Sequence, residues 1–183
     1  MQPFGCVNRI INARGKSFPK ATGGCPMYKY TYEEIADKYI DTIYRLALSR
    51  TKSPQYAEDI TQDVFVKLIS NRKKFDSEEH LKAWLLRVTI NLTKDLFSSS
   101  WFKTTAELED NITYETEEQG DLMDALMKLP KKYRTVIHLH YYEGYSVEEI
   151  AHIIGATAGT VKSQLHRGRQ MLKAVIEEGE EVG

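Results

Sequence analysis

Apolar residues recur at intervals of three and four along most of the chain from residue 31 onward, with polar residues between them. This spacing places the apolar side chains on one face of an α-helix. The first such segment covers 31–50, and its apolar face consists of Ile35, Tyr39, Ile43, Leu46 and Ala47. We expect the next helix to begin directly afterwards, because Ser53 can cap it and Pro54 suits a first helical position.

This second helix, from about 54 to 69, has two different faces. Its inner face consists of Ala57, Ile60, Thr61, Val64 and Leu68. Its opposite face carries Asp59, Gln62, Asp63 and Val66. An exposed valine among carboxylates fits either an ordinary solvated face or a surface that contacts another protein. The residues alone favour the solvated face.

A third, longer helix is predicted from a Ser77 cap to about Phe97. Its buried stripe is expected at Leu81, Leu85, Val88, Leu92 and Leu96. One flank of the same helix carries an aromatic ring, a guanidinium, an amide and an ammonium group, from Trp84, Arg87, Asn91 and Lys94. Such side chains suit unstacked bases and phosphates. The alternative is that Trp84 is simply a core residue.

The C-terminal part begins with a helix from Leu122 to Leu129, which Pro130 should break. The next helix is expected to contain Tyr133, Val136, Ile137, Leu139 and His140. In total, the stretch from Leu129 to Lys173 is predicted as four short helices, of which the last two form a helix-turn-helix.

Local signals mark both helices of this motif. Ser146 followed by Glu149 is a capping box, which begins the first helix. Gly155 should end that helix, because glycine adopts the left-handed backbone at little cost. Thr157 can cap the second helix, on which Val161 faces inward. The outer sides of the second helix and its cap carry residues that reach phosphates and base edges, namely Thr157, Thr160, Lys162, Ser163, Gln164, His166, Arg167 and Arg169. The alternative is a small helical bundle with a solvated basic helix.

Composition and charge fit an all-α protein of two small helical domains. The hydrophobic content of 42% is enough for real cores, and the net charge of −1 does not by itself indicate nucleic acid. However, seven acidic residues and no basic ones lie from Glu107 to Asp121, whereas Lys128 to Lys173 contains eight Lys or Arg and three Glu. The predicted organisation begins with a flexible tail at 1–27 and a first domain at 28–97. A flexible acidic linker at 98–120 leads to a helix-turn-helix domain at 121–176, and an acidic tail follows at 177–183.

Several classes of function are disfavoured. We find no nucleophile constellation, phosphate-binding glycine loop or metal-ligand cluster, so we expect no enzyme, cofactor, metal or small-molecule substrate. The two cysteines, Cys6 and Cys25, lack the spacing of a zinc site. No apolar run approaches the ~18 residues that cross a bilayer, and no signal-peptide core is present. We therefore expect no membrane insertion and a cytoplasmic location.

Three stretches resemble the sigma-70 family, and in particular its small two-domain members of the extracytoplasmic-function (ECF) type. LPKKYRTVIHLHYYEGYSVEEIAHIIGATAGTVKSQLHRGR is similar to region 4, the C-terminal promoter-binding domain. AEDITQDVFVKLI is similar to region 2.2, and FDSEEHLKAWLLRVTINLTKDLF to regions 2.3 and 2.4. One departure is that many relatives have a run of arginines after the position of Asp95, where this chain has Leu96, Phe97 and three serines.

The resemblance implies a sigma factor that brings bacterial core RNA polymerase to promoter DNA. The acidic face of the second helix would dock on polymerase, and the flank with Trp84 would open the −10 element, with a flipped base held around 75–81. The 158–170 helix would read the −35 element, and the linker would thread the polymerase cleft. Family members are commonly held by an anti-sigma factor. The alternatives are a free-standing helix-turn-helix regulator and a pure interaction protein.

Overall fold

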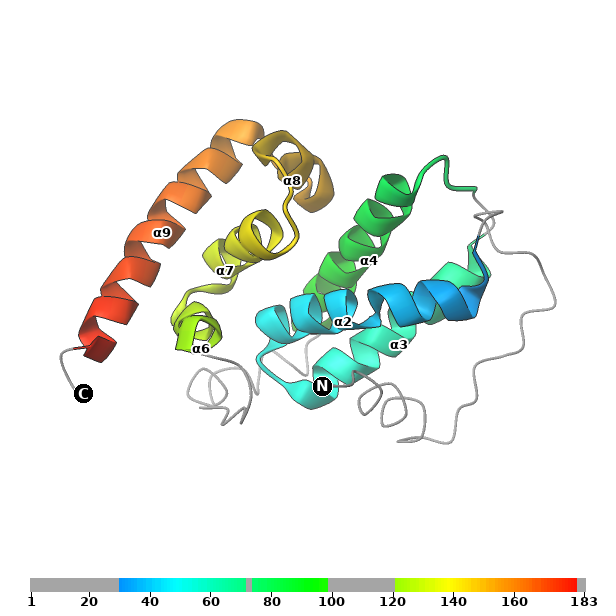
Figure 1. Ribbon diagram of the computed structural model, residues 1–183, viewed down its shortest axis with the longest axis horizontal. Helices are drawn as coiled ribbons and strands as arrows, with labels where there is room; N and C mark the ends of the chain where they lie inside the picture. The colour runs from blue at the N-terminus through cyan, green and yellow to red at the C-terminus, as the bar shows by residue number, and fades with distance from the viewer. Residues whose placement is uncertain (1–29, 72–73, 99–120, 181–183) are drawn as a thin grey trace.

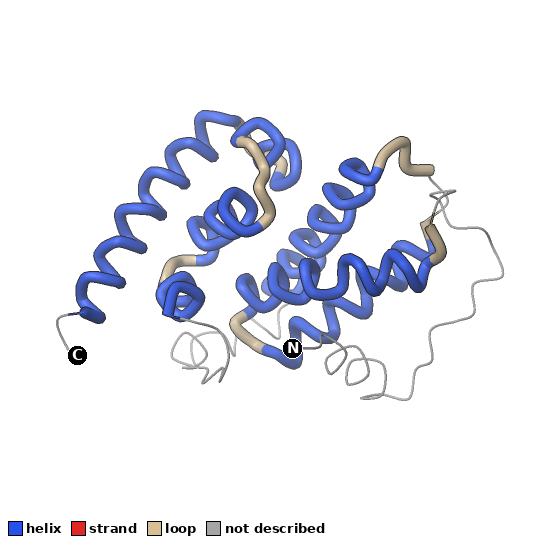
Figure 2. Tube along the Cα trace, viewed as in Figure 1, coloured by secondary structure: helices blue, strands red, loops and turns tan. Residues whose placement is uncertain are grey.

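The computed structural model describes residues 30–71, 74–98 and 121–180, and these residues form helices joined by short turns, without strands (Figures 1 and 2). The helices are α2 Tyr32–Thr51, α3 Pro54–Ser70, α4 Glu78–Ser98, α6 Asp121–Lys128, α7 Lys131–Ile137, the π-helical turn His138–Tyr142, α8 Val147–Ile154 and α9 Ala158–Glu180. The predicted all-α class is thus confirmed. The predicted tail 1–27, nearly all of the linker 98–120 and the last residues of the acidic tail lie outside the described residues.

The boundaries of the first helices follow from their capping residues. Thr31 forms a capping box with Glu34 at the start of α2, and Lys52 ends the helix in the left-handed conformation, with a φ of 55°. Ser53 caps α3, with Pro54 in its first turn, as predicted. These two helices and α4 pack around one core, in which Ile43, Val64 and Leu81 are fully enclosed.

The fourth helix is buried on two sides, whereas a single stripe was predicted. Leu81 and Leu85 lie in the first core, but Val88, Leu92 and Leu96 are only partly buried. A second side of α4 is equally buried, and its residues are Leu86, Thr89, Ile90 and Thr93. The prediction was incomplete because the C-terminal helices cover this second side.

The C-terminal helices pack around α7, which is buried along most of its length. Pro130 separates α6 from α7, as predicted. Gly168 lets α9 approach α7 closely, since a Cβ atom there would lie 2.8 Å from Ile137 Cδ1. The regular helix expected to continue through His140 instead widens into the π-helical turn from His138, which leaves the His140 ring half-exposed.

The two groups of helices share part of a core. Leu46 of α2 and Leu86 and Ile90 of α4 belong to the same buried cluster as Leu126, Val136 and other residues of the C-terminal helices. Figure 1 shows α7 and α8 on the side of the second group that faces α2 and α4. Separate patterns predicted the two domains, but the patterns did not predict this contact between them.

Candidate nucleic-acid interface and docking surface

The turn between α8 and α9 has the geometry of a helix-turn-helix. The Ser146 hydroxyl accepts from the Glu149 N–H at 3.3 Å, and the Glu149 carboxylate accepts from the Ser146 N–H at 2.8 Å, which completes the predicted capping box. The Ser146 hydroxyl also donates to the Glu149 carboxylate at 2.7 Å, and this hydrogen bond, followed by the one from the Ser146 N–H, lowers the pKa of Glu149. Gly155 has a φ of 70°, so the predicted left-handed turn is confirmed.

The second helix of the motif begins with its own cap. The Thr157 hydroxyl accepts from the Thr160 N–H at 3.2 Å. Val161 and Leu165 face inward and are buried. Thr157, which was predicted both as a cap and as a DNA contact, therefore has a structural role at the start of α9.

One side of α9 forms a polar hollow with α7. Thr160, Ser163, Gln164 and Arg167 line a space of about 380 Å³ together with Lys132 and Tyr133 of α7. The Tyr133 ring is buried, but its hydroxyl lies at this surface, where a hydrogen bond with Arg167 and then one with Lys132 lower its pKa. Arg167 and Lys132 bring two positive charges to this hollow, which suits a phosphate.

Sequence reasoning missed Lys132 and Tyr133 as members of this surface. The available signal was the Lys131-Lys132 pair directly after Pro130. Tyr133 was predicted only as a core residue. Its hydroxyl reaches the surface because α7 crosses beneath α9, and such a crossing does not follow from helical periodicity.

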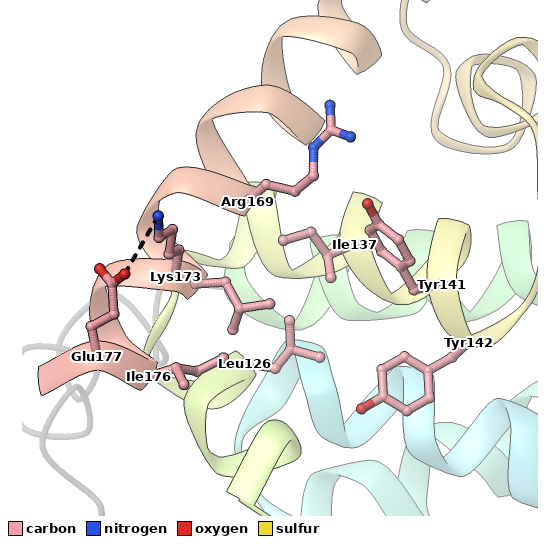
Figure 3. A pocket seen from close by; sticks show the side chains of 9 residues that line it. Leu126, Ile137, Tyr141, Tyr142, Arg169, Lys173, Ile176 and Glu177 are labelled. Carbon is pink, nitrogen blue, oxygen red and sulfur yellow. Dashed lines mark ion pairs between the residues drawn. The ribbon is translucent and has the colours of Figure 1, made fainter. Parts of the chain in front are cut away.

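The remaining predicted residues of α9 lie elsewhere on the helix. Lys162 and His166 are exposed, and Arg169 borders an apolar groove of about 500 Å³ between α9, α6 and the π-helical turn (Figure 3). Leu126, Ile137 and Ile176 line this groove, and an ion pair of 3.4 Å between Lys173 and Glu177 lies at its rim. The structure thus brings half of the eight predicted residues together in one hollow.

The flank of α4 that was predicted to bind DNA faces α8. Arg87 donates to the carbonyl of His152, and Lys94 Nζ lies 3.5 Å from the carbonyl oxygen of Ile154. Trp84 is half-buried and packs edge-on against Phe75, with 5.4 Å between ring centroids. The fourth predicted member of this flank, the exposed residue Asn91, shares a helix face with the other three.

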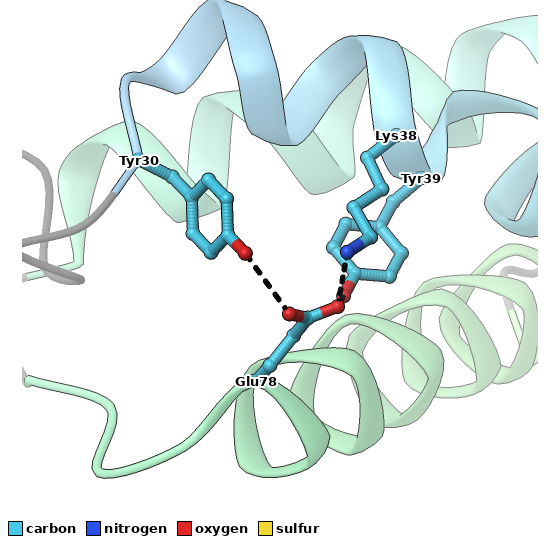
Figure 4. A network of polar contacts seen from close by, with 4 residues as sticks. All are labelled: Tyr30, Lys38, Tyr39 and Glu78. Atoms are coloured by element: carbon cyan, nitrogen blue, oxygen red, sulfur yellow. Dashed lines mark hydrogen bonds and ion pairs between the residues drawn. The ribbon is translucent and has the colours of Figure 1, made fainter.

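A cluster of polar side chains fixes the start of α4 against α2. The Glu78 carboxylate accepts from the Tyr39 hydroxyl at 2.8 Å and from the Tyr30 hydroxyl at 3.1 Å, and it pairs with Lys38 (Figure 4). The hydrogen bond with Lys38, then that with Tyr39, lowers the pKa of Glu78. This cluster holds the N-terminal end of the Trp84 flank in place.

The predicted docking face of α3 is a surface of mixed character. Val66 is 52% exposed, and Asp63 is exposed beside it. Asp59 and Gln62 are half-buried on the same helix. Since Val64 and Phe65 already anchor α3 in the core, the exposure of Val66 leaves apolar area available to a partner.

Two kinds of site are absent from the described ranges. Residues 30–71, 74–98 and 121–180 contain no group of three or more His, Cys, Asp or Glu that could hold a metal ion. Within the same part of the chain, no helix has the length and apolar character needed to cross a membrane.

These features define an all-helical protein with a helix-turn-helix, and comparison with known proteins identifies its family. Residues 35–103 match Sigma-70 region 2, and residues 119–172 match Sigma-70, region 4. The ECF RNA polymerase sigma factor SigW of Bacillus subtilis is 32% identical over 162 residues, which cover 78% of this chain and 87% of SigW. SigM of the same organism is 29% identical, with 81% of this chain and 97% of SigM covered. The chain belongs to the ECF sigma factors of the sigma-70 family.

A solved structure supports the same fold. The sigma factor RpoE of Bartonella quintana, in complex with the anti-sigma factor NepR, has 25% sequence identity and a TM-score of 0.62. The match covers 80% of this chain and 96% of that chain. The chain is therefore a sigma factor that directs RNA polymerase to promoters, which excludes the free-standing regulator. Sigma factors are initiation factors and not enzymes.

Proposed function

We propose that the three surfaces divide the work of promoter recognition. The acidic face of α3 docks on core polymerase through Asp59, Gln62, Asp63 and Val66. The flank of α4 with Trp84, Arg87, Asn91 and Lys94 binds the opened −10 element. The outer sides of α9 enter the major groove at the −35 element. Because polymerase and promoters lie in the bacterial cytoplasm, the factor acts there.

The polar hollow between α7 and α9 carries this proposal. Thr160, Ser163 and Arg167 meet Lys132 beside a capped helix N-terminus that follows the left-handed turn at Gly155. Hydroxyls and cations at this end of a recognition helix position it on the phosphate backbone, while its outward side chains reach base edges. The near-neutral total charge is consistent with a factor that gains DNA affinity from the polymerase it joins.

The relative with a solved complex supports a further partner. RpoE is bound there by the anti-sigma factor NepR. We propose that this chain is likewise held by an anti-sigma factor until an inducing signal arrives. Co-purification of the tagged chain from its native cells, with and without added core polymerase, tests this. An anti-sigma factor should be recovered from uninduced cells and lost in exchange for core.

Charge reversal on α3 tests the polymerase dock. Asp63→Arg should abolish binding to core polymerase, because the family's docking site on the largest polymerase subunit is basic and the new charge is repelled. Asp41→Arg is the matched control, since it reverses an exposed carboxylate that lies on α2 and not on the proposed docking face of α3. Gel filtration of each variant with core measures the complex. Equal complex formation by both variants would contradict the assignment.

A further inference from the structure

Three cationic side chains, Arg50, Lys131 and Arg134, lie together where α2 packs against α7. The two arginines are buried, with 6% of Arg50 and 3% of Arg134 exposed. The Arg50 guanidinium donates to the hydroxyls of Thr93 and Thr135, each at 2.6 Å, and that of Arg134 donates to two backbone carbonyls. These hydroxyl and carbonyl partners are neutral, so they bring no negative charge into the cluster.

Lys131 is the member of this cluster that solvent reaches. It is half-buried, and its Nζ lies 3.5 Å from the centroid of the Phe97 ring. Among the described residues, no ion pair joins Lys131 to a carboxylate. Lys38 also lies over an aromatic ring, that of Tyr39, but it pairs with the Glu78 carboxylate. The two lysines therefore differ in the charge of their neighbours, which makes Lys38 an internal control.

The neighbours of Lys131 favour its neutral amine. Burial, followed by the charges of Arg50 and Arg134, lowers the pKa of Lys131 to about 8, whereas the hydrogen bond with Glu78 raises the pKa of Lys38. At pH 7.5 roughly a quarter of the Lys131 side chains are neutral, against about one in a thousand for an ordinary lysine. Desolvation and a neighbouring cation are the two ways in which a protein activates a lysine amine as a nucleophile.

We propose that Lys131 is a covalent modification site that is acylated by an acyl phosphate. The nitrogen lone pair attacks the carbonyl carbon and forms the C–N bond. The C–O bond to phosphorus breaks, inorganic phosphate leaves with the electron pair, and the amine proton passes to water. An anionic donor is favoured because the guanidinium groups of Arg50 and Arg134 attract its charge. The inference goes beyond the proposed function and does not depend on it.

Acylation removes one of the three positive charges from the cluster. The amide that forms has no charge to desolvate and is not repelled by Arg50 and Arg134, whereas the ammonium is. Lys131→Gln, which imitates the acylated side chain, should therefore melt about 2–4 °C above Lys131→Arg, which keeps the charge. Equal melting temperatures, or a lower one for Lys131→Gln, would overturn this effect of the modification.

Acetyl phosphate is the probe for the reaction itself. The full chain is incubated with it at pH 7.5, and mass spectrometry of peptides gives the initial rate at each lysine. The larger neutral fraction favours Lys131 by more than a hundredfold, but the less basic amine is also a weaker nucleophile, as is known for thiols. Lys131 should therefore be acetylated at least about tenfold faster than Lys38. Equal rates at the two lysines would overturn the proposal.

A neutral donor tests the preference for an anion. With p-nitrophenyl acetate, Lys131 should still react faster than Lys38, but the ratio of the two rates should be smaller than with acetyl phosphate. Added salt should lower the ratio for acetyl phosphate more than for the neutral ester, because salt screens the attraction. The same ratio with both donors would overturn the assignment of an anionic donor.

The pH dependence of acetylation separates an activated amine from one that is merely accessible. The rate at Lys131 should level off above about pH 8, where its amine is already neutral, whereas the rate at Lys38 should still rise at pH 10. This profile needs no substitution, so it stands even if variants of the cluster fail to fold. In Arg50→Met, which removes one neighbouring cation, Lys131 should react severalfold more slowly while Lys38 is unchanged. A rate at Lys131 that rises in parallel with that at Lys38 up to pH 10 would overturn the proposal.

Discussion

Arg167 and Arg169 lie on different sides of α9, although only one residue separates them in the sequence. Arg167 belongs to the hollow with Lys132 and Thr160, whereas Arg169 borders the apolar groove. Arg167→Ala should therefore weaken promoter binding by the holoenzyme by about 1–3 kcal/mol, as expected for a lost DNA contact. Arg169→Ala should cost less. Titration of promoter fragments at two salt concentrations checks this, and equal losses would contradict the placement.

His138 is a fully buried histidine at the junction of the two units. Burial, and then the positive charge of Arg45, lowers its pKa to about 4. The Glu143 carboxylate lies 3.8 Å from Nε2, and its attraction does not offset burial. The folded state thus keeps this imidazole neutral where the unfolded chain, with an ordinary histidine pKa of about 6.5, binds a proton.

The buried, neutral His138 makes the folded protein less stable in acid. Stability from the neutral His138 is fully present above pH 6.5 and is lost as the pH falls toward 4, which amounts to about 2 kcal/mol between pH 7 and pH 5. His138→Phe keeps an aromatic ring against Tyr142 and should remove that share of the acid sensitivity. Urea unfolding at both pH values provides the measurement. If the free energy of unfolding of His138→Phe falls between pH 7 and pH 5 by as much as that of the parent, the assignment is refuted.

Individual residues were predictable where local chemistry decides their role. Ser53, Ser77, Ser146 and Gly155 cap or end helices as their side chains and backbone preferences dictate. Leu86 and Ile90 were not recognised as buried, because their partners lie on the other unit and periodicity within α4 carries no information about them.

At the scale of the elements, the helix-turn-helix depends on the residues that cap its first helix, α8. Ser146 and Glu149 satisfy three donors at the start of α8, an eight-residue helix with little other support for its N-terminus. Ser146→Ala should cost about 1 kcal/mol of stability. Ser70→Ala, an exposed serine at the C-terminal end of α3, should cost much less. Thermal unfolding of both variants compares the costs, and equal melting temperatures would count against the capping box.

The predicted boundaries of the helices lie close to the observed ones, whereas the residues that pack against each helix were not predicted. The helices that begin near residues 32, 54 and 78 were expected from apolar periodicity and caps. The π-helical turn at His138–Tyr142 was not, since an added residue in a helical turn leaves no signal in a pattern of period 3.6. Of the candidate site, the sequence indicated the α9 residues but not the α7 residues that complete the hollow.

At the scale of the whole molecule, the two sigma regions fold as adjacent helical groups that also contact each other. Family membership and the helix-turn-helix agree on a factor that recruits polymerase to promoters. The contact of α4 with α8 places the flank that carries Arg87 and Lys94 beside the first helix of the helix-turn-helix.

In-vitro transcription tests the central claim most directly. The purified chain would be added to sigma-free bacterial core polymerase on genomic fragments that include its own upstream DNA. Run-off transcripts should appear only when the chain is present, and Asp63→Arg should remove them while Asp41→Arg leaves them unchanged. Transcripts that form equally well without the chain, or no transcripts although the chain binds core, would contradict its role as a promoter-directing sigma factor.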